Sequence, residues 1–195
     1  AGRPLDDVRA IALGRVVYVQ GSAGGSNYGK YVVIEHDWGN GPLLSLYAHL
    51  ASASVKEGQR IPAGHVVGRM GYTGAGINRE RGHVHLELNI LLSLQFDAWH
   101  KMKFNTQNKH GIHNGMNLAG LDIASLLQAH HRDPGITLPE FLERTPIYYK
   151  VTCPRRGKLE LADRYPWIRR GAHHRPSPSW EISFTPAGFP LAIAP

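Results

Sequence analysis

One stretch carries most of the information in this chain: Gly82-His83-Val84-His85-Leu86-Glu87-Leu88. Its polar and apolar residues alternate, which predicts a β-strand, because successive strand side chains point to opposite faces. His83 and His85 then share one face, and the other face, expected in the core, carries Val84, Leu86 and Leu88. Two imidazoles on one face can bind one metal ion, or one can bind the metal while the other transfers protons. A zinc site needs more ligands than this strand supplies.

The chain upstream of this stretch consists of short β-type runs separated by glycine. Strands are expected at 15–19, 31–36 and 43–49, with further short runs at 55–61 and 65–70. A polar, glycine-containing loop leads into the two-histidine strand, and a third histidine, His49, lies upstream in Tyr47-Ala48-His49-Leu50. Many short strands with regular turn signals predict a mainly β fold, built on an antiparallel sheet or sandwich.

The composition changes after Leu94. Residues 95–117 are polar and rich in Asn, Lys and His, so a long loop is expected there. Apolar residues at helical spacing predict a helix over 118–131, which Asp133-Pro134-Gly135 ends. A short helix is expected over 138–144, with Thr137 as its N-cap and Pro139 in its first turn.

A second β-rich segment begins at Ile147, with runs at 147–151, 180–184 and 189–193. The chain is therefore expected to have three parts. Residues 1–94 form a core, residues 95–146 form a loop and helical connector that completes the domain, and residues 147–195 form a small, basic, β-rich C-terminal extension.

The formal net charge of the 195-residue chain is +7, and the charge is densest between Lys150 and Arg175. A basic protein favours anionic partners such as nucleic acid, anionic lipid or an acidic cell-wall polymer. This segment has neither an RNA-binding aromatic signature nor a recognition-helix pattern, so no nucleic-acid partner is expected. The alternative is a solvated basic surface. No apolar run is long enough to span a membrane.

Cys153 is the only cysteine of the chain. A single cysteine excludes an intrachain disulfide and a cysteine-rich zinc cluster, so any zinc ligands must be His, Asp or Glu. No Cys-His arrangement surrounds Cys153, which is expected to be an inert thiol.

Six motifs occur in a fixed order over about 80 residues: 10–17, 28–36, 46–50, 55–64, 71–74 and 82–88. In this order they resemble the M23 peptidase family, the lysostaphin or LytM type of zinc endopeptidase that cuts peptide cross-links of bacterial cell walls. The resemblance implies an antiparallel β fold of the LytM type, a Zn²⁺ cofactor, peptidoglycan peptides as substrate and an extracytoplasmic location, periplasmic or secreted.

The resemblance also implies roles for individual residues. His85 corresponds to a zinc ligand, and His83 and His49 correspond to the two catalytic histidines beside the metal. A zinc-activated water would attack the peptide carbonyl while these imidazoles transfer protons. Glu87 shares the strand face of the two histidines, where it would either orient a ligand imidazole or form a surface ion pair.

The remaining ligands of the family, a histidine and an aspartate four residues later, would fall upstream of Ala1. Asp6 and Asp7 are the nearest acids, and no histidine precedes them. An internal stretch, His113-Asn114-Gly115-Met116-Asn117, has a related shape but ends in Asn, which carries no charge. Its use would require a circularly permuted site, and the alternative is a structural segment.

The leading expectation is a zinc-dependent endopeptidase that hydrolyses peptidoglycan cross-links. The alternative is a non-catalytic module of the same fold, degenerate or N-terminally truncated, that binds peptidoglycan or regulates another cell-wall hydrolase. A lipoyl-like carrier would need a lysine at a hairpin tip, and Lys56 is not placed there.

Of the other histidines, His36 is expected to be structural and His65 exposed at the start of a strand. Surface positions are expected for the rest, because their spacing does not tie them to the main site: His100, His110, His130, His131, His173 and His174.

Overall fold

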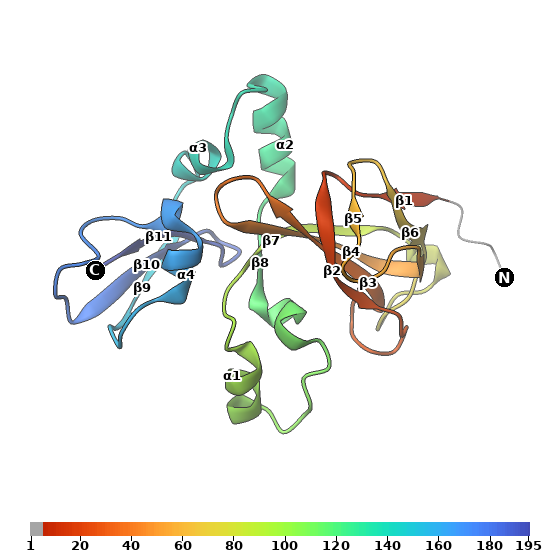
Figure 1. Cartoon of the computed structure of the whole chain (residues 1–195), viewed down its shortest axis with the longest axis horizontal. Coiled ribbons are helices and arrows are strands. Elements are labelled where there is room, and N and C mark those ends of the chain that lie inside the picture. The colour runs from red at the N-terminus through yellow and green to blue at the C-terminus, as the bar shows by residue number, and fades with distance from the viewer. Residues whose placement is uncertain (1–5) are drawn as a thin grey trace.

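The computed structural model describes residues 6–195, so the first five residues of the expected core lie outside the described part. Two antiparallel sheets lie at opposite ends of the long axis (Figure 1). The first sheet contains β1 (Asp7–Arg9), β2 (Gly14–Gln20), β3 (Lys30–Asp37), β4 (Pro42–Ala53), β5 (Arg60–Ile61), β6 (Val66–Met70), β7 (His85–Leu91) and β8 (Leu118–Gly120). The mainly β, antiparallel fold predicted from the sequence is confirmed.

Strand β4 organises the first sheet. One of its edges pairs with β3, and its other edge pairs with β7 along Leu43–Ala48 and with β6 along Leu50–Ala53. Eight consecutive residues of β4, from Leu43 to Leu50, are buried. A strand covered on both faces carries a continuous apolar run rather than an alternating one, which explains the composition of this segment.

The two faces of the sheet carry separate apolar clusters. One cluster contains Tyr47, Leu50 and Ile34 and is closed by β1, β5 and β6. The opposite face contains Leu46, Ala48 and Tyr31, and Ile112 of the following connector packs against it. β4 contributes side chains to both clusters. The direction of each β4 side chain therefore determines the face of the sheet on which it lies.

The connector contains more helix than its composition suggested. The predicted loop at 95–117 is wrong in its first half, where α1 covers Phe96–Lys103. Short 3-10 turns follow at Gly111–His113 and Gly115–Asn117. Phe96, His100 and Phe104 recur at helical spacing and their rings lie against each other, so one-sided packing outweighs the polar composition.

The next predicted helix begins later than expected. Residues Leu118–Gly120 form β8, which extends the edge of β7, and α2 covers Ile123–Arg132 after the N-cap Asp122. The start of the predicted helix is therefore wrong and its end is confirmed. The short helix α3 (Leu138–Glu143) has the predicted cap, because the Thr137 side chain accepts from the Glu140 backbone N–H.

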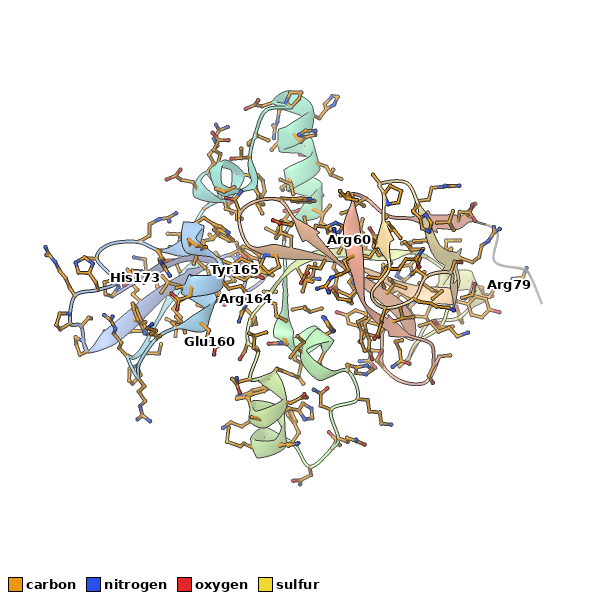
Figure 2. The ribbon with its side chains drawn as sticks, viewed as in Figure 1. Arg60, Arg79, Glu160, Arg164, Tyr165 and His173 are labelled. Atoms are coloured by element: carbon orange, nitrogen blue, oxygen red, sulfur yellow. The ribbon has the colours of Figure 1, made fainter. Side chains whose placement is uncertain are left out.

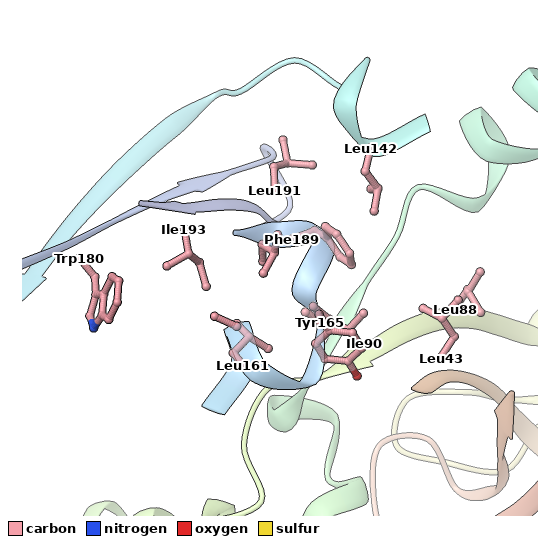
Figure 3. Packing of buried hydrophobic residues seen from close by; sticks show 13 residues of the cluster. Leu43, Leu88, Ile90, Leu142, Leu161, Tyr165, Trp180, Phe189, Leu191 and Ile193 are labelled. Carbon is pink, nitrogen blue, oxygen red and sulfur yellow. The ribbon is translucent and has the colours of Figure 1, made fainter. Parts of the chain in front are cut away.

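The second sheet has three strands: β9 (Tyr149–Pro154), β10 (Ser179–Phe184) and β11 (Pro190–Ala194). Helix α4 (Glu160–Arg164) and a 3-10 turn at Pro166–Ile168 occupy the long stretch between β9 and β10. Figure 3 shows that apolar side chains of this part join Leu43, Leu88 and Ile90 of the first sheet in one cluster. The boundaries at 94/95 and 146/147 stay predictions.

Tyr165 ties the two parts together. Its hydroxyl donates to the Pro42 carbonyl at 2.8 Å and accepts from the Leu91 backbone N–H at 2.9 Å. Arg164 beside it donates to the Leu91 carbonyl at 2.9 Å, and both residues face the first sheet in Figure 2. One phenol therefore satisfies two backbone groups at the ends of two strands.

The described residues 6–195 contain no helix with the length and apolar character needed to cross a bilayer.

We expect Tyr165→Phe to destabilise the fold by about 1–3 kcal/mol, because the buried Leu91 N–H and Pro42 carbonyl would lose their partner. Urea unfolding measures the change. Tyr148→Phe is the matched control, since Tyr148 is 73% exposed. Equal stability of the two variants would show that the phenol does not hold the two parts together.

His36 is structural, as predicted, and is fully buried. Its Nδ1 donates to the Leu13 carbonyl at 2.8 Å, so Nε2 is the atom that accepts the Ser45 hydroxyl at 2.7 Å. Burial lowers the pKa of His36, and the Leu13 carbonyl opposes this effect. The ring therefore stays neutral in the folded protein at a pH where an ordinary histidine takes up a proton.

This lowered pKa makes stability depend on pH. Below about pH 6.5 the unfolded chain binds a proton at His36 that the folded chain does not, so the free energy of unfolding falls as the pH falls. His36→Gln keeps a donor and an acceptor without a titrating group. Urea unfolding between pH 7.5 and 5.5 should show a shallower loss in this variant, and an unchanged slope would contradict the assignment.

Candidate metal and catalytic site

Three histidines meet at one edge of the first sheet. His49 is buried near the middle of β4, His85 begins β7 and is half-buried, and His83 precedes that strand and is exposed. The ring centroids of His49 lie 4.8 Å from His83 and 5.6 Å from His85, and one nitrogen of each ring lies within 4.8 Å of the others. The structure thus brings together the three histidines that the sequence analysis selected.

His49 reaches this cluster because β4 contains a bulge. Lys30 of β3 pairs with Leu50 and Val32 pairs with Tyr47, so β4 carries one extra residue between these pairs. His49 has φ +59°, the only positive value among the described non-glycine residues 6–195. In a regular strand His49 would lie on the face opposite Ala48 and its partner His85. The left-handed residue breaks this alternation and turns the imidazole toward His85.

Two loops hold the bulge in place. The His49 backbone N–H donates to the Tyr28 carbonyl at 2.9 Å, and its Nδ1 donates to the Thr73 carbonyl at 2.7 Å. The Thr73 hydroxyl donates to the Leu50 carbonyl and accepts from the Lys30 N–H. The two loops meet at Gly29, where a Cβ atom would lie 2.4 Å from the Thr73 backbone, so only glycine permits this approach.

The hydrogen bonds fix the tautomer of each imidazole, because a carbonyl oxygen can only accept. Nδ1 of His49 and Nδ1 of His83 both donate to backbone carbonyls, those of Thr73 and Arg81. In the neutral form of these two rings, Nε2 is therefore the nitrogen without a proton. Burial lowers the pKa of His49, and its histidine neighbours add to that effect while the Thr73 carbonyl opposes it.

His85 is held through its other ring nitrogen, Nε2. Its Nε2 lies 2.7 Å from Glu87 Oε1, and the same carboxylate accepts from the Tyr28 hydroxyl at 2.7 Å and from Asn89 Nδ2 at 3.0 Å. Three donors surround one carboxylate, so in the neutral imidazole of His85 the proton lies on Nε2 and Nδ1 carries none. Burial and contact with Glu87 raise the pKa of Tyr28, so its hydroxyl keeps its proton. Glu87 contacts the imidazole rather than a surface cation.

The donor set fits a metal in part. His85 has the arrangement common for metal-binding imidazoles, with one nitrogen on a carboxylate and the other unprotonated. Within residues 6–195 the cluster contains histidines alone and no carboxylate ligand. Asp7 is engaged elsewhere, since it pairs with Arg9 and Arg69 at 3.1 Å. If His49 and His83 transfer protons, His85 alone is left to hold zinc, and further ligands are then required.

The alternative motif around His113 takes no part in the cluster. Asn117 is buried, and its amide bonds to Ser93 and to the Ile112 carbonyl. The His113 ring stacks on Tyr18 at 5.5 Å. This segment is structural, and it covers the sheet face next to the site.

Some expectations for other residues were wrong. Val84 and Leu86 are 36% and 37% exposed rather than in the core, while Leu88 is buried. The apolar cluster shared with the C-terminal part includes Leu88 but neither Val84 nor Leu86. His100 and His110 are buried rather than on the surface, His65 and His173 are half-buried, and the predicted exposure is confirmed for His130, His131 and His174. His110 is buried because it bonds to Tyr18 and to the Gly25 carbonyl.

Three residues at the site were not singled out in advance: Tyr28, Thr73 and Asn89. Asn89 could have been found by strand parity, since it shares a face with Glu87 and His85. Tyr28 and Thr73 act through loop contacts that no local pattern specifies.

These contacts predict different tautomers for the three rings. Nitrogen-15 NMR at pH 8 should find the proton of His49 and of His83 on Nδ1, and the proton of His85 on Nε2. Glu87→Gln should leave His85 with a mixture of tautomers, because a neutral amide replaces the carboxylate. Glu143→Gln, remote on α3, is the control and should change nothing. A common tautomer for all three rings would contradict the geometry.

The first half of the chain is similar to known proteins. The sequence pattern of Peptidase family M23 matches residues 1–97. The chain is 38% identical over 79 residues to murein hydrolase activator NlpD of Escherichia coli, covering 40% of this chain and 20% of that protein. It is 38% identical over 74 residues to lipoprotein NlpD of Yersinia enterocolitica, covering 38% of this chain and 71% of that protein.

Among solved structures, the catalytic domain of lysostaphin from Staphylococcus simulans aligns with 27% identity and a TM-score of 0.36, covering 45% of this chain and 60% of that one. The chain spans about a fifth of the length of the longer curated relatives it matches. The family pattern, together with a relative of which the chain covers more than two thirds, shows that the chain belongs to peptidase family M23.

Proposed function

We propose that this protein is a zinc-dependent endopeptidase that hydrolyses peptide cross-links of bacterial peptidoglycan. The observation that carries the proposal is the convergence of His49, His83 and His85, each with one ring nitrogen held by a protein acceptor. Zinc, when bound, lowers the pKa of a water molecule and polarises the peptide carbonyl.

The residues of the cluster have separate roles in the proposed hydrolysis. His85 binds the metal through Nδ1, while Glu87 holds the opposite ring nitrogen and adds electron density to the ligand. His49 accepts a proton at Nε2, since its Nδ1 proton is fixed on the Thr73 carbonyl. His83 lies exposed at the solvent edge, where its Nε2 would first take up a proton from solvent and then give that proton to the departing amine. Further metal ligands must complete the set.

Substitution of the catalytic histidines tests the proposal. The protein, expressed from its complete reading frame, is incubated with purified peptidoglycan, and released cross-link fragments are quantified. We expect His49→Ala to lower the rate by about 100-fold or more, the usual contribution of a general acid or base. His131→Ala on the exposed surface of α2 is the control and should retain full activity.

Full activity of His49→Ala would overturn the catalytic role of this histidine. Zinc analysis gives an independent readout: about one equivalent is expected in the wild type, with a clear loss in His85→Ala. Retention of zinc by His85→Ala would remove His85 from the ligand set.

A second function is favoured by one specific observation. The cluster holds no acidic ligand within residues 6–195, and relatives at 38% identity are named murein hydrolase activators. In this alternative the domain has no activity of its own and stimulates another cell-wall hydrolase. Absence of fragments from the protein alone, with faster release when a murein hydrolase is added, would select the activator.

Both functions require contact with the cell wall, so we propose an extracytoplasmic location. Two of the relatives are described as lipoproteins, which is consistent with this location.

A further inference from the structure

A cavity of about 590 Å³ lies in the C-terminal part and shares no residue with the histidine cluster. It forms between the start of α4, the loop after the 3-10 turn at Pro166–Ile168, and β10. We call it the basic cavity, because its lining includes Arg155, Lys158, Arg169, His173, His174 and Arg175. In Figure 2, His173 lies on the far side of Tyr165 from the first sheet.

The walls of the basic cavity are held in place by Arg155. Its guanidinium lies 4.0 Å from the ring centroid of Trp180, and it donates to the backbone carbonyls of His173 and Arg175. His173 Nε2 in turn donates to the Ile193 carbonyl at 2.8 Å. Arg155 thus holds the loop that contains His173 and Arg175 by hydrogen bonds to its backbone.

The basic cavity keeps an excess of positive charge. Residues 147–195 contain eight Lys or Arg and three Asp or Glu. All three acids are paired within this part: Glu160 with Arg164, Asp163 with Arg169, and Glu181 with Lys150. Lys158 and Arg175 line the cavity with exposed side chains, and neither forms an ion pair with a described residue. The lining therefore contains Arg155, Lys158, Arg169 and Arg175 and a single acid, Asp163.

We propose that the basic cavity binds a polysaccharide that bears carboxylate or phosphate groups. Guanidinium and ammonium groups match these oxyanions in charge and hydrogen-bonding geometry, and the volume lies in the usual range of ligand sites. The lining offers no exposed Phe, Tyr or Trp ring for base stacking, since its one such residue, Trp180, is 5% exposed beneath Arg155. This feature favours an anionic polysaccharide over a single-stranded nucleic acid.

The basic cavity would bind its ligand independently of the histidine cluster. A cavity at the opposite end from β1 would hold the protein on an anionic polymer whether or not the cluster has activity. The proposal therefore does not rest on the peptidase function, and a variant such as His49→Ala should bind as the wild type does.

Binding measurements with a double variant test the proposal. Fluorescence anisotropy is recorded with polygalacturonate as the carboxylate probe and poly(glycerol phosphate) as the phosphate probe, at low and high salt. We expect saturable binding to at least one probe, weakened by salt and about tenfold weaker in Lys158→Ala/Arg175→Ala. The probe that binds more tightly identifies the group that is recognised.

The matched control is Arg156→Ala/Lys103→Ala, which removes the same charge from exposed positions outside the lining. It should change the affinity less than twofold. An equal loss in both double variants would mean that binding follows the net charge, and it would overturn the cavity assignment. So would binding to neither probe.

Two further measurements complete the test. Equal or tighter binding of a single-stranded oligonucleotide, lost in the cavity variant, would overturn the polysaccharide assignment. Lys158→Glu gives a second way to alter the cavity, should the double variant unfold, and it should weaken binding at least as much.

Discussion

The site depends on one backbone conformation, the left-handed turn of the chain at His49 in β4. A non-glycine residue in this region costs on the order of 1 kcal/mol, and the surrounding contacts must hold it there. The Tyr28 and Thr73 carbonyls provide two of these contacts, and the close approach at Gly29 provides the third. The strain directs an imidazole to the sheet face on which β7 presents His85. Without the bulge, His49 would point toward Tyr47 and its apolar cluster.

The second constraint is the carboxylate of Glu87. Three donors from three different positions converge on it, and their sum fixes which nitrogen of His85 is unprotonated. The Thr73 backbone carbonyl also accepts from an imidazole, but from Nδ1 of His49 rather than from Nε2. The site therefore combines one Nδ1 lone pair with two Nε2 lone pairs. Hydrogen bonds to residues outside the cluster create this difference between chemically identical side chains.

Much of this could be predicted from the sequence, because the strands of the first sheet have local signals. Alternation, glycine spacing and the ordered motifs located the strands and the histidine trio. Predictions failed for the burial of individual side chains. His100 is buried by aromatic neighbours on its own helix, which polar composition concealed. Val84 precedes β7 and Leu86 lies in it, and both remain exposed because the apolar cluster that buries Leu88 does not include them.

The sequence by itself determined the mainly β fold, the order of the strands along the chain and the three histidines, since these follow from periodicity and from motifs in fixed order. The tertiary structure alone decided that His49 turns to the face of His85, which requires a bulge against β3 and two loops far apart in the chain. It also decided that the basic side chains after β9 surround one cavity. The physical reason is the same in both cases: the contacts join residues whose separation along the chain leaves no local pattern.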